Sequence, residues 1–152
     1  MFQKILVCLD GSNLSEQILR YVSEEASGSN KKVTLLNAVT LPITTPVAIP
    51  GDASNILPMM PSPEQIAADE AKAKKYLEKQ AQSLKGLGIK TDCVVVIGDP
   101  GSSIVDYAEK NAIDLIAIAT HGRSGLRRIL FGSVAEYVIK HSKLPILLIK
   151  PK

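Results

Sequence analysis

Five short apolar segments recur along the chain and predict a parallel β-sheet. They span residues 5–9, 33–39, 93–97, 115–119 and 146–149. Each is a nearly continuous run of hydrophobic residues with little polar alternation, which is typical of strands covered on both faces. Strands of this kind occur in sheets that carry helices on each side.

Helical patterns lie between these segments, so β and α elements alternate along the chain. The first helix is expected from about Asn13 to Ser27, with Leu14, Ile18, Val22 and Ala26 on its buried stripe and Gly28 just after its end. A second is expected from Ser62–Pro63 to near Gly86, a third from Asp99–Pro100 and a fourth from Gly132–Ser133. Five strands and four helices predict a doubly wound α/β fold with helices on both faces.

The segment at about residues 40–62 interrupts this alternation. It contains five of the nine prolines and predicts a long irregular loop within a single domain that spans residues 1–152. Loops of this length are usually either functional lids or disordered, and both interpretations are open here.

Composition excludes several classes of protein. The net charge of +3 comes from 18 basic and 15 acidic residues spread along the chain, so no basic block predicts nucleic-acid binding. No apolar run approaches the roughly 20 residues that span a bilayer, and the start lacks the features of a secretory signal. Cys8 and Cys93 lie inside apolar runs, which predicts buried thiols and no disulfide. These features favour a cytoplasmic protein that binds neither nucleic acid nor membrane.

Candidate binding residues follow two of the predicted strands. Asp10 comes directly after the first strand, and the fourth strand ends at Ala119, shortly before Gly122. Gly132 and Ser133 open the last helix. Ligands of parallel α/β sheets gather at the carboxyl ends of the strands, and exposed N–H groups at a helix start bind phosphate. These residues therefore predict a phosphate-containing ligand.

At these positions the sequence resembles the universal stress protein family. ATP-binding members carry Gly-x2-Gly-x9-Gly-Ser/Thr between the fourth strand and the fourth helix, and here the pattern reads Ala119-x2-Gly122-x9-Gly132-Ser133. Alanine thus replaces the first glycine of the motif. The resemblance extends to the opening residues 4–12, the turn at 120–122 and the closing residues 144–149.

The resemblance implies a Rossmann-like, adenine nucleotide alpha hydrolase-like fold with strand order 3-2-1-4-5. It also implies a regulatory homodimer in the stress response that binds ATP, ADP or AMP, with or without Mg²⁺. The expected ligand-binding residues are Leu9, Asp10, Ala38, Val39, Ala119, Gly122, Arg123, Gly125, Gly132, Ser133 and Val134. The homodimer is expected to form through the last strand, Ile146 to Ile149, because an apolar edge strand would otherwise pair without limit.

Simpler roles are open for the same residues. Residues 10–12 could be only a strand-to-helix turn, Gly132 only a helix start, and Ser133 only a capping residue. Arg123, Arg127 and Arg128 could steer phosphate or form a solvated loop. His121 has no partner at metal-ligand spacing, and no residue is assigned a catalytic role.

Two further functions compete with a nucleotide-binding module. A slow ATPase would need a positioned base, and neither a nucleophile–base pair nor a Walker motif is present in the sequence. A phosphoacceptor receiver domain would use Asp10, Asp99, Thr120 and Lys150, which follow the first, third, fourth and fifth strands, and it needs Asp10 and Asp99 at neighbouring strand ends. In strand order 3-2-1-4-5, however, two strand spacings of about 4.8 Å separate these two residues.

Overall fold

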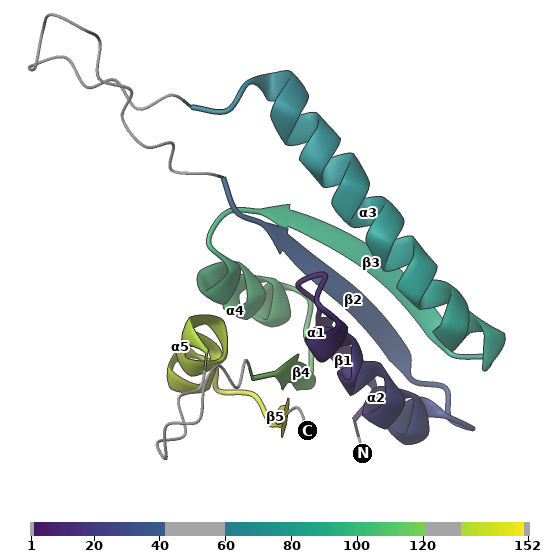
Figure 1. Ribbon diagram of the computed structural model, residues 1–152. Coiled ribbons are helices and arrows are strands. Elements are labelled where there is room, and N and C mark those ends of the chain that lie inside the picture. The colour runs from purple at the N-terminus through teal and green to yellow at the C-terminus, as the bar shows by residue number, and fades with distance from the viewer. Residues whose placement is uncertain (1, 42–59, 121–131, 151–152) are drawn as a thin grey trace, which may run out of the picture.

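A five-stranded parallel sheet forms the centre of the structure, and the expected strand order is confirmed (Figure 1). The computed structural model describes residues 2–41, 60–120 and 132–150. The strands are β1 (Lys4–Cys8), β2 (Lys32–Val39), β3 (Lys90–Ile97), β4 (Leu115–Ala119) and β5 (Ile146–Ile149). They are arranged β3-β2-β1-β4-β5, with every neighbouring pair parallel.

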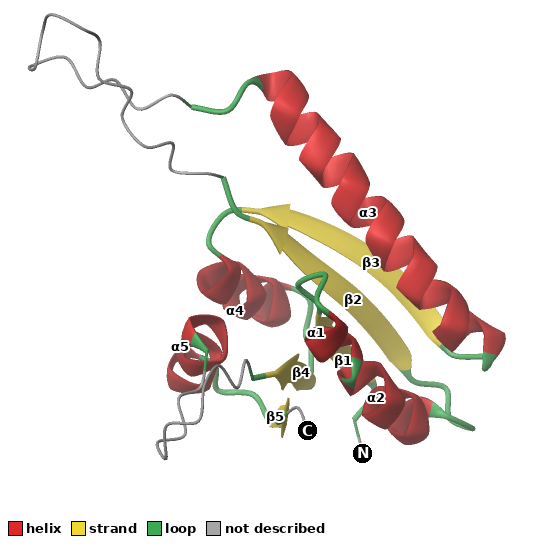
Figure 2. Ribbon diagram, in the orientation of Figure 1, coloured by secondary structure: helices red, strands yellow, loops and turns green. Residues whose placement is uncertain are grey.

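The helices cover both faces of this sheet (Figure 2). They are α1 (Asn13–Glu16), α2 (Ile18–Ala26), α3 (Pro63–Gly86), α4 (Pro100–Lys110) and α5 (Ser133–His141). Buried residues of α2 and α3 join one hydrophobic cluster, and buried residues of α4 and α5 join a second on the opposite face. The fold is therefore the doubly wound, Rossmann-like arrangement that the apolar pattern predicts.

The central strand β1 contributes to both clusters. Ile5 and Val7 pack on the α2 and α3 side, and Leu6 and Cys8 pack on the α4 and α5 side. This division follows from the two-residue period of a β-strand. It explains why the strand reads as a continuous apolar run: each face of the sheet needs half of its residues.

Side-chain caps fix the start of three helices. Ser12, Ser62 and Asp99 each accept a hydrogen bond from the backbone N–H three residues later, over 3.1, 3.2 and 3.0 Å. A proline follows directly after two of these caps, at the first position of α3 and of α4. The starts predicted at Ser62–Pro63 and Asp99–Pro100 are thus confirmed.

The expected first helix is wrong in one respect, because it is divided at Gln17. The Gln17 N–H donates to the carbonyl of Leu14 instead of continuing the α-helical ladder, and the Ser15 hydroxyl donates to the carbonyl of Ser12. A serine side chain that bonds to nearby backbone competes with helical hydrogen bonding. The described chain therefore has five helices and not four, and Leu14 is only half-buried.

Three strands also differ from their expected bounds. β1 begins at Lys4 and ends before Leu9, β2 begins at Lys32, and β3 begins at Lys90 instead of Cys93. The polar start of β3 is part of the sheet because it pairs in register with β2. Most of the predicted loop at 40–62 falls on residues 42–59, which lie outside the described residues.

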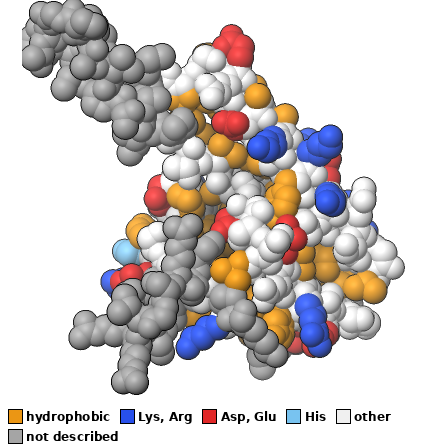
Figure 3. Space-filling model, in the orientation of Figure 1, with side chains coloured by type: hydrophobic (Ala, Val, Ile, Leu, Met, Phe, Trp, Pro, Cys, Tyr) orange, Lys and Arg blue, Asp and Glu red, His pale blue; other side chains and the backbone are white. Residues whose placement is uncertain are grey.

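On the face shown in Figure 3, Lys and Arg side chains are scattered among acidic and apolar ones. No helix in the described ranges is both long and apolar enough to cross a membrane.

One close contact sets how α5 packs on α4. Gly101 lies in the first turn of α4 and is buried against Tyr137 of α5. A Cβ added at Gly101 would lie 2.8 Å from Cγ of Tyr137, which is closer than carbon atoms pack. Glycine is needed here for the approach of the two helices.

We expect Gly101→Ala to lower the free energy of unfolding by about 1–3 kcal/mol, because α5 must move away from α4 to admit the methyl group. Gly86→Ala is the matched control, since Gly86 is also helical and an added Cβ there meets nothing within 4 Å. The control should be neutral or stabilising by up to about 1 kcal/mol. Urea unfolding of both variants measures the difference, and equal effects would contradict the close contact.

Candidate functional site

A cavity lies at the carboxyl ends of the central strands. It has a volume of about 420 Å³, within the range of about 300–1,000 Å³ typical of small-molecule sites. Its walls come from β1, β2 and β4 and from the starts of α4 and α5. The chain runs from β1 to β2 on one side and enters β4 on the other, so this is the point where the strand order reverses.

The structure brings seven of the predicted binding residues to this cavity. They are Leu9, Asp10, Ala38, Ala119, Gly132, Ser133 and Val134. Val39 does not line it, because consecutive strand residues face opposite sides and Ala38 occupies the cavity side. Gly122, Arg123 and Gly125 lie outside the described residues.

Seven further residues line the cavity and were not predicted. They are Cys8, Ser15, Leu36, Pro100, Ile104, Ile118 and Ala135. Most are apolar, and in the sequence they are indistinguishable from core positions. The two-residue strand period is the one available signal, because Leu36 lies on the same face of β2 as Ala38.

A compact turn holds Asp10 at the mouth of the cavity. Its Oδ1 accepts hydrogen bonds from the Ser12 backbone N–H over 2.9 Å and from the Ser12 hydroxyl over 2.6 Å. Gly11 between them has a φ of +84°, in the left-handed region that favours glycine. The Ser15 hydroxyl accepts from the backbone N–H of Asp10 over 3.3 Å. Asp10 therefore has a structural role in the turn, alongside any role in binding.

A second contact fixes the ends of β1 and β2 to each other. The side-chain amide of Asn37 donates to the carbonyl of Leu9 over 2.8 Å, and the Leu9 N–H donates to the carbonyl of Leu36 over 2.9 Å. These bonds extend the pairing past the last residue of β1. They hold the wall formed by Leu9 and Ala38 in place.

The start of α5 is open to the cavity. Its first residue follows Gly132, which has φ −55° and ψ 153°, and no side chain among the described residues caps the helix. Any residue can adopt this conformation, so the backbone itself does not demand glycine there. The absence of a side chain leaves the first-turn N–H groups accessible to an anion, which the positive end of the helix dipole also favours.

Ala119, which replaces a glycine of the motif, is the last residue of β4 and is buried at the cavity wall. Its φ is not positive, so alanine fits the backbone without strain. Alanine can therefore affect ligand binding here only because its methyl group takes up space in the cavity.

Cys8 lies in the wall of the cavity. Burial raises the pKa of its thiol from 9.0 to about 12, because the charged thiolate is poorly solvated there. Cys8 and Cys93 are both free thiols. Cys8 is buried as predicted, whereas Cys93 is only partly buried.

The geometry required of a receiver domain is absent. β2 lies between β1 and β3, so Asp99 follows a strand that does not neighbour the strand before Asp10. Asp99 instead caps α4, and its hydrogen bonds from the N–H and hydroxyl of Ser102 lower the pKa of its carboxyl group. Within the described ranges, no group of three or more His, Cys, Asp or Glu residues could hold a metal ion.

Comparison with known proteins gives consistent matches along the whole chain. A model of the universal stress protein family matches residues 1–150. Universal stress protein MJ0531 of Methanocaldococcus jannaschii is 32% identical over 150 residues, which cover 99% of this chain and 83% of that protein.

Two solved structures share the fold. Protein MJ0577 of the same organism superposes with a TM-score of 0.74 at 28% identity, covering 100% of this chain and 98% of the other. The universal stress protein of Archaeoglobus fulgidus in complex with dAMP gives a TM-score of 0.66 at 24% identity, and the match covers 98% of each chain.

The turn at Asp10 generates a test that separates its structural role from a binding role. Asp10→Ala removes the acceptor for Ser12 and should lower the free energy of unfolding by about 1 kcal/mol. Asp10→Asn keeps a side-chain oxygen for Ser12 and removes only the charge, so we expect nearly wild-type stability. If Asp10 also binds a ligand through its charge, both variants should bind ATP more weakly in calorimetric titration. Unchanged affinity in both would assign Asp10 to the turn alone.

Proposed function

This chain belongs to the universal stress protein family, and on that premise we propose that it binds an adenine nucleotide in the cavity at the ends of β1, β2 and β4. The observation that carries the proposal is that one cavity of about 420 Å³ joins an apolar wall to an uncapped helix start. A nucleotide has a matching division into an apolar base and an anionic phosphate chain.

The two parts of the cavity support one orientation of the nucleotide. Leu36, Ala38 and Ile118 supply an apolar surface against which a flat base can be buried. Gly132 and Ser133 lie at the start of α5, where backbone N–H groups can bind phosphate oxygens. We assign the base to the side of β2 and the phosphates to the side of α5.

ATP is the nucleotide we propose, with Mg²⁺ held mainly by the phosphates. Magnesium commonly binds through substrate phosphates and water with few protein carboxylates, so the lack of an acidic cluster in the described residues is compatible with it. Position 119 decides how much room the ligand has near β4.

We further propose that binding, and not hydrolysis, is the main activity. The described cavity residues include no histidine and no lysine that could serve as a general base, and Asp10 is engaged with Ser12. The protein would then act in the cytoplasm as a regulatory module of the stress response whose shape or partners depend on nucleotide occupancy. The free thiols support a reducing location.

A homodimer through β5 completes the proposal. β5 pairs only with β4 in the described chain, and it presents Ile146, Leu147 and Leu148 only partly buried at the outer edge of the sheet. Pairing with a second copy about a two-fold axis would cover this edge, so that β5 would have a neighbouring strand on both sides.

Substitutions at both ends of the nucleotide motif test the binding site. Gly132→Glu should abolish ATP binding, because a carboxylate would occupy the anion position at the start of α5. Gly132→Ala is the control for backbone effects, since φ −55° accepts alanine. Ala119→Gly should leave affinity equal or higher, at a stability loss of roughly 0.5–1 kcal/mol.

We expect the wild-type protein to bind ATP with a micromolar dissociation constant, which corresponds to a favourable binding free energy of about 8 kcal/mol. Calorimetric titration of ATP with magnesium measures it. Binding restored only by Ala119→Gly would show that the alanine closes the site to ATP. If neither the wild type nor Ala119→Gly binds ATP, the proposal is contradicted.

The dimer is tested by a charge placed on the β5 edge. Leu148→Lys should shift the protein to monomer, because a buried lysine at a strand–strand contact is poorly solvated. Ile139→Lys makes the same change on the exposed side of α5 and should remain dimeric. Sedimentation equilibrium distinguishes the two, and a monomeric wild type would rule out the proposed interface.

A further inference from the structure

A row of three lysines crosses the end of the sheet opposite to the nucleotide cavity. Lys4 of β1 pairs in register with Lys32 of β2, and Lys32 pairs with Lys90 of β3. Residues paired in register share a face, so their side chains start from the same side of the sheet. Like charges directly opposite each other destabilise a sheet, so negative charge near this row of lysines would stabilise the structure.

A small cavity lies beside two of these lysines. It has a volume of about 100 Å³ and is lined by Lys4, Lys32, Thr34, Tyr107, Asn111 and Ile113. These residues come from the starts of β1 and β2 and from the last turn of α4 and the residues that follow it. The cavity shares no lining residue with the larger one.

Thr34 gives this cavity an unused polar group. The residue is only 5% exposed, and its hydroxyl makes no hydrogen bond to any described residue. The hydroxyl oxygen is not itself fully buried, so it can donate to water or to a ligand in the cavity that Thr34 lines.

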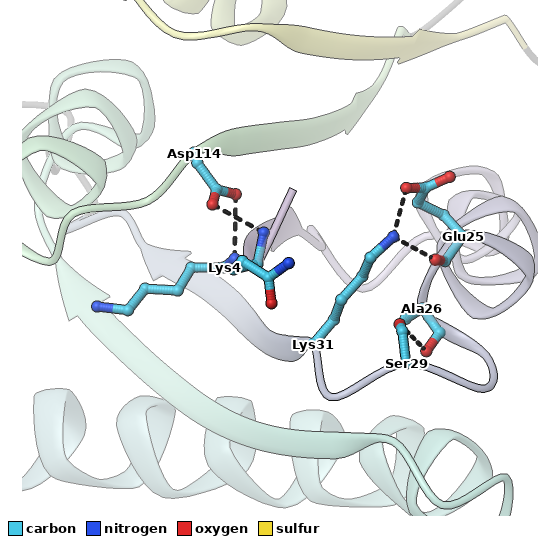
Figure 4. Close-up of polar contacts among 7 residues, drawn as sticks. Lys4, Glu25, Ala26, Ser29, Lys31 and Asp114 are labelled. Carbon is cyan, nitrogen blue, oxygen red and sulfur yellow. Dashed lines mark hydrogen bonds and ion pairs between the residues drawn. The ribbon is translucent and has the colours of Figure 1, made fainter. Parts of the chain in front are cut away.

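The ammonium group of Lys4 is not neutralised by the nearby carboxylate. Asp114 accepts hydrogen bonds from the backbone N–H groups of Gln3 and Lys4, over 2.8 and 3.0 Å. Figure 4 shows the side chain of Lys4 extending away from that carboxylate. Its Nζ donates to the carbonyl of Asn111 over 3.3 Å. Lys31, by contrast, is fully engaged with Glu25.

The other two lysines have different partners. Nζ of Lys32 lies 2.6 Å from the carboxylate of Asp92, and this contact raises the pKa of Lys32. Both side chains of the pair are about half exposed, so the contact is a weak surface ion pair. Lys90 donates to the side-chain oxygen of Asn30 over 2.7 Å and does not line the cavity.

We propose that this cavity is a binding site for a small tetrahedral oxyanion of the phosphate type. Each ammonium group has three N–H donors, so Lys4 and Lys32 retain donors after their present contacts. Neighbouring strands are about 4.8 Å apart, which lets both ammonium groups contact one anion while the Thr34 hydroxyl donates to a third oxygen. The last carbonyls of α4 carry partial negative charge, so the anion needs both lysines to offset it.

Inorganic phosphate is the probe, followed by ¹⁵N and methyl chemical shifts during titration of the isotope-labelled protein. We expect saturable shifts at Thr34 and Ile113 that persist in Gly132→Glu, where the start of α5 is blocked. Thr34→Val keeps the shape and removes the hydroxyl, and it should weaken phosphate binding roughly tenfold, the value of one hydrogen bond to a charged group. Lys4→Gln should weaken it at least as much.

Lys90→Gln is the matched control, because it removes the same charge from the same row without touching the cavity. It should change the affinity less than about twofold, since an exposed charge outside the site is screened. Sulfate should compete with phosphate, and acetate should not. Equal losses of phosphate affinity in Lys4→Gln and Lys90→Gln would show that phosphate responds only to the overall positive charge of this surface, and this would overturn the proposal. Shifts that do not saturate, or that vanish in Gly132→Glu, would overturn it as well.

Discussion

The burial of β1 between two parallel neighbours is the constraint on which the rest of the structure depends. Its residues supply both hydrophobic clusters, and β2 and β4 pair on its two sides. The chain must therefore leave the end of β1 toward one side and return to β4 from the other. This divergence opens the larger cavity, and the turn after β1 places Asp10 at its mouth.

The two ends of the sheet differ chemically because all strands run in one direction. At the carboxyl ends, helix starts present N–H groups, and the cavity combines them with an apolar wall. At the amino ends, helices finish with their carbonyl groups, and Lys4 at the start of β1 donates to one of these, the carbonyl of Asn111 after α4. In this parallel sheet the positive ends of the helix dipoles lie at one end and the lysine side chains of the strand starts lie at the other.

Most of the fold could be predicted from the sequence, because continuous apolar runs, proline and capping residues act locally. The division of the first helix at Gln17 could not, since it depends on a side-chain hydrogen bond of Ser15. Strand pairing extends β3 back to Lys90, which its own polar sequence does not indicate. Seven of the binding residues that the family resemblance implies line the cavity. Apolar lining residues such as Ile104, and the lysine row, could not be predicted because they depend on packing and register.

The protonated state of Cys8 has a consequence for the chemistry of the cavity. Because burial raises the pKa of this thiol to about 12, very little of it is ionised at neutral pH. Peroxides attack the thiolate, so this sulfur is a poor target for oxidation to sulfenic acid. We therefore expect this part of the cavity wall to keep its apolar character under oxidising conditions.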